Sequence, residues 1–133
     1  MTDTVRLTIP HGEAYHGAAR LVVGGLAARL AFSYEHLEDI KLALDSFLAN
    51  DAYAVGPLLT IEIRVRDEGI ELRAGPVAEA LRLDLERDVP EAEGVGLGRL
   101  LSTLAEGVAV EDEAGTDWLR LEKRLPGKTV TRA

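Results

Sequence analysis

Three short stretches of the sequence carry residues whose types and spacing could do chemistry. The first is LALDSFLAN, residues 42–50, which puts a serine and an asparagine four positions apart. On a helix, Ser46 and Asn50 then lie one turn apart and about 40° around the axis, so their side chains can address one point. Taken alone, the pair is also explained as ordinary polar residues near the end of a surface helix.

The second and third stretches involve glycines. GVGLG, residues 94–98, stands directly before an apolar run with helical spacing. Alternating glycines let a backbone approach a ligand closely, and amides at a helix N-terminus can hold phosphate oxygens. A flexible loop ahead of a helix explains the same pattern. The third stretch pairs Asp67 with Gly69, for which a plain hairpin turn is the alternative.

The elements that must position these residues follow from the apolar periodicity. Val5, Leu7 and Ile9 alternate with polar residues until Pro10, which predicts a strand. A helix is predicted over 13–31. Ser33 is the expected N-cap of a second helix that leads to Asn50. The predicted core-facing stripe of this second helix, about 100° wide, comprises Leu37, Ile40, Leu44, Phe47 and Leu48.

The second half of the chain predicts more strands than helices. Alternating apolar residues from Pro57 onward predict a strand, and the turn at 67–69 joins it to a second strand in a hairpin. A less regular insert follows, with a short helix over 77–86 and the charge-rich stretch LERDVPEAEG. The remaining expected elements are a helix over 97–104, a strand around 108–110 and a last strand over 119–125.

This element order predicts the fold class. Strands joined by short turns favour an α/β two-layer sandwich whose sheet is mixed but mostly antiparallel, with the helices on one face. A chain of 133 residues with 47% hydrophobic residues fits one domain. We expect that domain to span 1–133, with an ordered core over about 5–125 and a loose tail at 126–133.

Composition excludes several classes of function. Twenty-three acidic against fifteen basic residues give a net charge of -8, which repels phosphate backbones and anionic lipid. We therefore expect no direct nucleic-acid or membrane binding, and the absence of cysteine suits a soluble, cytoplasmic protein. His11, His16 and His36 show no ligand spacing and are expected at the surface. Trp118 either serves the last strand or anchors a partner.

The motifs taken in order resemble a known family. A helix ending in asparagine, a strand, D-x-G, a strand, an insert, G-x-G-x-G entering a helix, and a final Gly-Thr strand resemble the histidine-kinase-like (GHKL, Bergerat fold) ATPases. Within them the chain looks most like the anti-sigma factor serine kinases. The resemblance runs from Val5 to about Leu125. It is carried by RLTIP, ARLVVGGLAARL, HLEDIKLALDSFLAN and GVGLGRLLSTLAEGVAVEDEAGT.

The resemblance implies a role for each matching residue, with ATP and magnesium as cofactors. Asn50 would coordinate the magnesium that bridges the nucleotide phosphates, as a hard oxygen ligand for a hard cation. Asp67 would accept a hydrogen bond from the adenine amino group, with Gly69 leaving room for the base. Thr116 would complete the adenine contacts, and segment 81–94 would form the lid. The glycines under the phosphates would be Gly94, Gly96 and Gly98.

Four positions depart from the family pattern. Ser46 stands where the active kinases carry a glutamate as general base, and a hydroxyl cannot accept a proton at neutral pH as a carboxylate does. Asp45 is no substitute, because it lies about 140° around the helix from Asn50. The other departures are Glu71 in place of the second glycine of the D-x-G-x-G box, and Asp51 and Ala54 in place of an alanine and a histidine.

The resemblance therefore implies a regulatory protein for transcription. It would bind a sigma factor or an anti-sigma antagonist through an ATP-binding-type domain, with impaired kinase activity, and form a homodimer as family members do. Two alternatives stay open. One is an active Mg-ATP-dependent serine kinase that phosphorylates the antagonist, and the other is a nucleotide-free structural adaptor.

Overall fold

The structure, a computed structural model, describes residues 3–30, 32–87 and 96–125. Its strands form one five-stranded sheet in the order β1-β2-β3-β5-β4, and all four strand pairs are antiparallel. The strands are β1 (Asp3–Pro10), β2 (Leu58–Arg66), β3 (Gly69–Gly75), β4 (Gly107–Glu113) and β5 (Thr116–Arg124).

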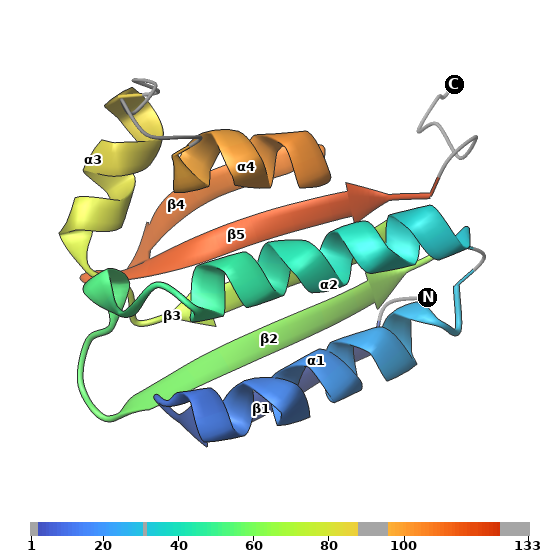
Figure 1. The fold of residues 1–133 in the computed structure, drawn as a ribbon, viewed down its shortest axis with the longest axis horizontal. Coiled ribbons are helices and arrows are strands. Elements are labelled where there is room, and N and C mark those ends of the chain that lie inside the picture. The colour runs from blue at the N-terminus through green and yellow to red at the C-terminus, as the bar shows by residue number, and fades with distance from the viewer. Residues whose placement is uncertain (1–2, 31, 88–95, 126–133) are drawn as a thin grey trace.

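Four helices cover one face of this sheet, which confirms the two-layer α/β sandwich (Figure 1). They are α1 (Glu13–Ala27), α2 (Tyr34–Leu48), α3 (Glu79–Arg87) and α4 (Leu97–Leu104), with a short 3-10 helix at Asp51–Tyr53 that the sequence pattern did not predict. In the described part of the chain, none of the helices has the length and apolar content needed to span a bilayer.

Helix α2 follows its sequence signals closely. The Ser33 side chain accepts a hydrogen bond from the His36 amide at 3.3 Å, which confirms the predicted N-cap. The predicted stripe faces the core, where Ile40 and Leu44 are fully buried. Helix α1 ends at Ala27, about four residues earlier than predicted.

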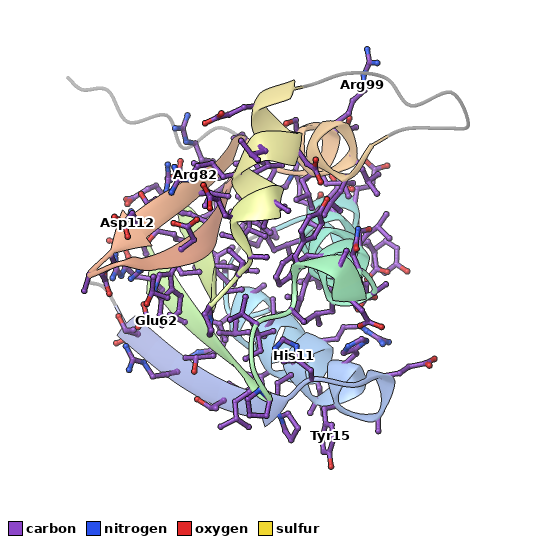
Figure 2. The ribbon with its side chains drawn as sticks, turned by 90° about the vertical axis from the view of Figure 1, so that its left-hand side faces the viewer. His11, Tyr15, Glu62, Arg82, Arg99 and Asp112 are labelled. Atoms are coloured by element: carbon purple, nitrogen blue, oxygen red, sulfur yellow. The ribbon has the colours of Figure 1, made fainter. Side chains whose placement is uncertain are left out.

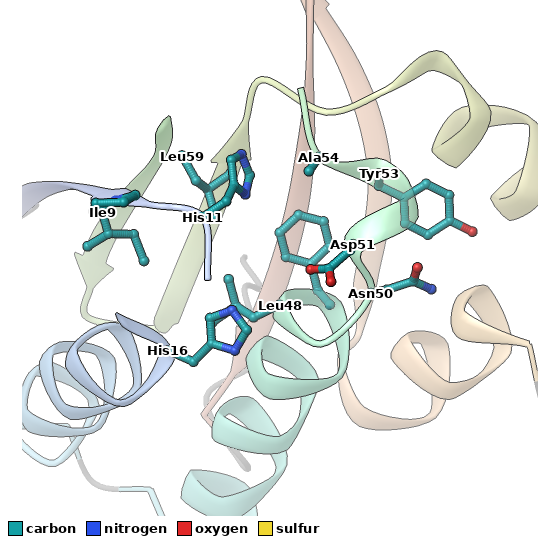
Figure 3. A pocket seen from close by; sticks show the side chains of 11 residues that line it. Ile9, His11, His16, Leu48, Asn50, Asp51, Tyr53, Ala54 and Leu59 are labelled. Atoms are coloured by element: carbon teal, nitrogen blue, oxygen red, sulfur yellow. The ribbon is translucent and has the colours of Figure 1, made fainter. Parts of the chain in front are cut away.

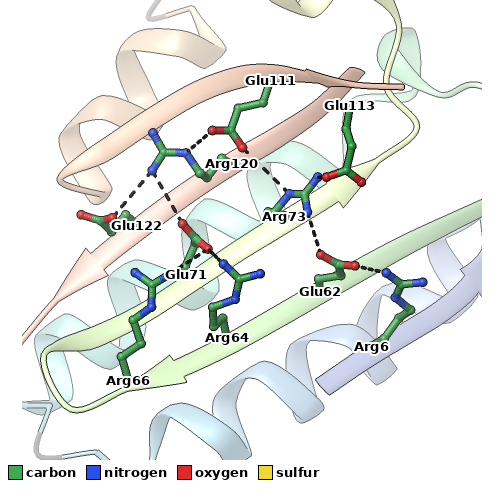
Figure 4. A network of polar contacts seen from close by, with 10 residues as sticks. All are labelled: Arg6, Glu62, Arg64, Arg66, Glu71, Arg73, Glu111, Glu113, Arg120 and Glu122. Atoms are coloured by element: carbon green, nitrogen blue, oxygen red, sulfur yellow. Dashed lines mark hydrogen bonds and ion pairs between the residues drawn. The ribbon is translucent and has the colours of Figure 1, made fainter. Parts of the chain in front are cut away.

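The two faces of the sheet differ in chemistry. The helix-covered face is apolar, with Ile61, Ile63 and Leu121 almost fully buried. The open face instead carries a network of five arginines and five glutamates (Figure 4). Near its middle, the Arg73 guanidinium bonds to Glu62 at 3.0 Å and stacks 4.8 Å over the Trp118 ring. The tryptophan therefore serves the sheet.

The two ends of the sheet have different neighbours. At one end, α2 leads to Asn50 beside the start of β2 and the last residues of β3; we call this the Asn50 end (left in Figure 1). At the other end lies the β2–β3 turn, near Lys123, whose ammonium contacts Asp39 in the first half of α2 at 3.4 Å. We call this the hairpin end.

Candidate functional site

Asn50 has a structural task in the fold. It lies two residues past the end of α2, and its Oδ1 atom accepts a hydrogen bond from the Ala52 amide at 3.2 Å. Asn50 is thereby the N-cap of the 3-10 helix at Asp51–Tyr53. The oxygen that the family resemblance assigns to magnesium is engaged with the protein's own backbone.

The residues one turn earlier are also engaged within the protein. The Ser46 hydroxyl donates to the Leu42 carbonyl at 2.8 Å, a bond within α2 itself. The Asp45 carboxylate pairs with the Arg20 guanidinium at 3.1 Å and joins α2 to α1. The strip of α2 that leads to Asn50 thus presents a hydroxyl, not a carboxylate, at the position that the family resemblance assigns to a general base.

Of the glycine run, Gly96 and Gly98 lie at the Asn50 end, while Gly94 falls outside the described residues. Gly96 is the N-cap residue of α4, and a Cβ added to it would meet nothing within 4 Å. Gly98 faces α3: a Cβ there would lie 2.9 Å from Leu85 Cδ2. The absence of a side chain at Gly98 therefore permits close packing of α3 on α4.

Asp67 and Gly69 lie at the hairpin end, so the structure does not bring them to Asn50. They belong to the β2–β3 turn, where a Cβ on Gly69 would come within 2.2 Å of the Lys123 carbonyl oxygen. The fifteen residues of α2 span about 22 Å between the two ends. The turn lies at the end opposite Asn50 because the nine residues of β2 first carry the chain along the whole sheet. The plain hairpin turn accounts for this pair.

Thr116 begins β5 at the Asn50 end but on the other face. Side chains alternate along a strand, and Thr116 has the same parity as Trp118 on the open face. Its neighbour Asp117 points to the helix side, where it accepts a hydrogen bond from Arg82 of α3 at 2.9 Å. Glu71 also lies on the open face, paired with Arg64 at 3.0 Å.

A narrow pocket lies beside Asn50, between the end of β1, the start of α1 and the end of α2 (Figure 3). Its free volume is about 20 Å³, the space of a single water molecule. Pockets for small organic ligands are usually more than ten times larger. Its lining residues are Ile9, Pro10, His11, His16, Phe47, Leu48, Asn50, Asp51, Tyr53, Ala54 and Leu59.

Sequence spacing did not bring these side chains together. His11 and His16, which were expected at the surface, are partly exposed and line this pocket, because the β1–α1 junction lies against the end of α2. In the described residues no cluster of three or more His, Asp or Glu side chains could hold a metal ion.

The residues that line this narrow pocket do not fit magnesium-bound ATP. Among the residues that line the pocket there is neither lysine nor arginine, and Asp51 adds a negative charge. Phosphate oxygens need cations or free amides, and the candidate magnesium ligand Asn50 caps a helix instead. Helix α3 contacts both neighbouring segments, since Asp84 accepts a hydrogen bond from the Tyr53 hydroxyl and Leu85 lies against Gly98.

Among known proteins, this chain is similar to several serine-protein kinases named RsbW. The chain is 29% identical over 127 residues to serine-protein kinase RsbW of Halalkalibacterium halodurans, covering 85% of this chain and 78% of that kinase. It is 25% identical to the RsbW kinase of Bacillus subtilis, covering 96% and 89%. These relatives confirm the resemblance to the anti-sigma factor serine kinases. No protein-family profile matches the chain.

A solved structure has the same fold. The crystal structure of the RsbU and RsbW domains of Rv1364c from Mycobacterium tuberculosis matches with a TM-score of 0.63 at 15% sequence identity. The match covers 98% of this chain and 35% of that longer chain. It supports the arrangement of strands and helices described above.

Proposed function

Since the chain is related to the RsbW serine-protein kinases, we propose that it is a regulatory protein of the anti-sigma type that acts by binding a partner rather than by phosphorylating it. The partner would be a sigma factor or an anti-sigma antagonist. Transcription would then be regulated by holding that partner in, or releasing it from, a complex. A homodimer and a cytoplasmic location belong to the same proposal.

One observation carries the proposal: Ser46 occupies the general-base position and its hydroxyl is bonded to the Leu42 carbonyl inside the helix. A general base must reach the proton that it removes and must have a pKa near the working pH. A serine hydroxyl fails the second condition, and Asp45 is turned toward Arg20 of α1. Phosphoryl transfer therefore lacks its base in this chain.

Two features of the Asn50 end favour the hypothesis of a nucleotide-free adaptor over that of an active kinase. The pocket there has room for about one water, and Asn50 Oδ1 is bonded to the Ala52 amide. We accordingly propose that partner binding does not require nucleotide. Should ATP and magnesium bind nonetheless, Asn50, Gly96 and Gly98 are the proposed contacts, because they lie at one end of the molecule.

The test uses the purified chain and candidate sigma factor and antagonist proteins from the same organism. We expect one of them to form a complex in calorimetry with the same affinity in the presence and absence of Mg-ATP. In the same mixtures, radiolabelled ATP should transfer no phosphate to the antagonist.

An active RsbW kinase serves as the positive control for phosphate transfer. Transfer by this chain at a rate comparable to that control would exclude the proposal. A complex that forms only with Mg-ATP, and is lost in Asn50→Ala, would replace the adaptor with a nucleotide-dependent binder.

A further inference from the structure

The open face of the sheet is a surface of the molecule that none of the described helices covers. All four helices lie on the other side of the strands. Figure 2 shows the two layers edge-on, with Glu62 on the side of the sheet away from the helices. The polar network of this face is therefore available to a partner in the described part of the molecule.

The glutamates in the middle of this face lie beneath the arginines. The side chains of Glu62 and Glu71 are only 10% and 9% exposed, whereas those of Arg6 and Arg124 are 66% and 58% exposed. The exposed glutamates of the network belong to β4, at the edge of the sheet. A partner that approaches β1, β2 or β3 from this side therefore meets guanidinium groups first.

At the hairpin end of this face, arginines outnumber the glutamates that they contact. Glu71 pairs with three arginines at 3.0, 3.6 and 3.8 Å, and Glu122 pairs with two at 2.9 and 3.6 Å. Glu111 of β4 also pairs with one of them at 3.1 Å. The chain carries a net charge of -8, so this local excess of positive charge has the opposite sign to the whole. The four arginines are Arg64, Arg66, Arg120 and Arg124.

A hollow lies between two of these arginines. Arg66 of β2 and Arg124 of β5 are both in register with Gly69 of β3, so the three residues form one row across the strands. The two outer strands are about 10 Å apart, and Gly69 places no side chain between them. The hollow has a free volume of about 180 Å³, many times the space of one water molecule. Arg66, Gly69 and Arg124 line it together with Glu68, Glu71 and Glu122.

The chemistry of this hollow suits a carboxylate. A guanidinium has five N–H donors in a planar fork that matches the two oxygens of a carboxylate. Arg66 directs one nitrogen at Glu71, and Arg124 directs one at Glu122. Their other N–H groups can donate to an incoming acidic side chain, as a charge-assisted pair on each side of the hollow.

The charges disfavour two other occupants. If the open faces of two copies met about a twofold axis, their arginine-covered surfaces would face each other, and like charges repel. Nucleic acid would be attracted by the arginines but repelled by the net charge of -8. A protein segment that carries several acidic side chains fits the surface without either cost.

We propose that the hairpin end of the open face is a docking surface for an acidic segment of a partner protein, with one carboxylate of that segment in the hollow between Arg66 and Arg124. The identity of the partner as a sigma factor or an anti-sigma antagonist rests on the proposed function. Electrostatic complementarity at such a surface speeds association and selects the partner.

The experiment compares one double variant with a matched control. The hollow variant is Arg66→Gln, Arg124→Gln, and the control variant is Arg29→Gln, Arg99→Gln, which removes two exposed arginines away from the open face; Figure 2 shows Arg99 projecting from α4. Glu71 keeps two arginines in the hollow variant and Glu122 keeps one, so this variant should fold. Circular dichroism checks that it does.

A hexaglutamate peptide is the first probe, titrated at low salt and followed by NMR. Shift changes in the unmodified chain should centre on Arg66, Gly69 and Arg124. Affinity should fall at least about tenfold in the hollow variant and less than about twofold in the control, because two charge-assisted contacts are lost. Glu68→Gln should raise the affinity, since it removes a negative charge from the hollow. Equal affinity in the hollow and control variants would overturn the proposal.

The second probe is whichever candidate sigma factor or antagonist binds the unmodified chain in calorimetry. Its Kd should rise at least about tenfold in the hollow variant only. An unchanged Kd would overturn the docking surface and leave the proposed function intact. If neither candidate binds the unmodified chain, the proposed function fails, and the peptide titration still decides the docking surface.

Two further measurements test the other occupants. Sedimentation velocity should give the same oligomeric state for the hollow variant, the control variant and the unmodified chain. A change in the hollow variant alone would assign the face to a second copy and overturn the proposal. Short single-stranded DNA should bind more weakly than hexaglutamate, and tighter binding that is lost in the hollow variant would assign the face to nucleic acid instead.

Discussion

At the residue scale, the polar side chains at the end of α2 are bonded within the protein, which their spacing in the sequence did not indicate. Ser46 and Asn50 share a helix strip as their spacing indicated, but their oxygens are bonded to the Leu42 carbonyl and the Ala52 amide. Asp45, the adjacent carboxylate, is paired with Arg20. Each of these residues therefore has a structural role that can be measured apart from any ligand.

Asn50→Ala should lower the free energy of unfolding by about 1 kcal/mol, because it removes the cap of the 3-10 helix. Asn50→Ser, which keeps a capping oxygen, should cost only a few tenths of that. Ser46→Ala is the comparison at the neighbouring turn, and we expect a change within about 0.5 kcal/mol. Urea denaturation provides all three values. If Asn50→Ala proved as harmless as Ser46→Ala, the bond from the Ala52 amide to Asn50 would not stabilise the fold.

At the element scale, Gly69 and Gly96 differ in how closely the rest of the protein packs against them. A Cβ at Gly69 would lie 2.2 Å from the Lys123 carbonyl oxygen and would force β3 away from β5. Gly96 has no atom within 4 Å of an added Cβ. The tight approach of two strands thus requires glycine in the turn of the hairpin, whereas the N-cap of α4 does not require it for packing.

Gly69→Ala should therefore destabilise the protein by about 2 kcal/mol or more, because backbone atoms cannot move aside as a side chain can. Gly96→Ala should stay within about 0.5 kcal/mol. Thermal unfolding followed by circular dichroism distinguishes the two. Equal losses would mean that the β3–β5 approach is not the constraint at Gly69.

On the open face of the sheet, we predict that two arginines bonded to Glu62 contribute unequally to stability. Arg73→Ala should cost about 2 kcal/mol, since it removes the 3.0 Å bond to the largely buried Glu62 carboxylate and the contact with Trp118. Glu62 then keeps Arg6 as its arginine partner. Arg6→Ala removes another arginine from the same carboxylate, but that side chain is 66% exposed, so less than about 1 kcal/mol should be lost. A larger loss for Arg6→Ala in urea denaturation would contradict this order.

At the scale of the whole molecule, the proposal that partner binding needs no nucleotide has a thermodynamic consequence. A ligand that binds the folded state at 100 times its Kd stabilises it by about 2.7 kcal/mol and raises Tm by several degrees. We expect Mg-ATP at millimolar concentration to leave Tm of the unmodified chain unchanged in scanning calorimetry. An RsbW kinase under the same conditions is the positive control. A rise matching that control would contradict the proposal that this protein works without nucleotide.

The sequence by itself determined the elements and their buried faces, because both follow from local periodicity. The alternation in β1 and β2, the Ser33 cap and the stripe of α2 are each visible within a window of a few residues. The resemblance to the anti-sigma factor serine kinases also followed from the order of motifs along the chain. Order along the chain, however, does not specify distance.

Only the tertiary structure decided which motifs meet. Asp67 is separated from Asn50 because the nine residues of β2 run the length of the sheet, and strand parity puts Thr116 on the open face. The contacts of α3 with Tyr53, Asp117 and Gly98 join segments more than ten residues apart in sequence. Such contacts depend on how the two layers pack, and no local stretch of the sequence specifies them.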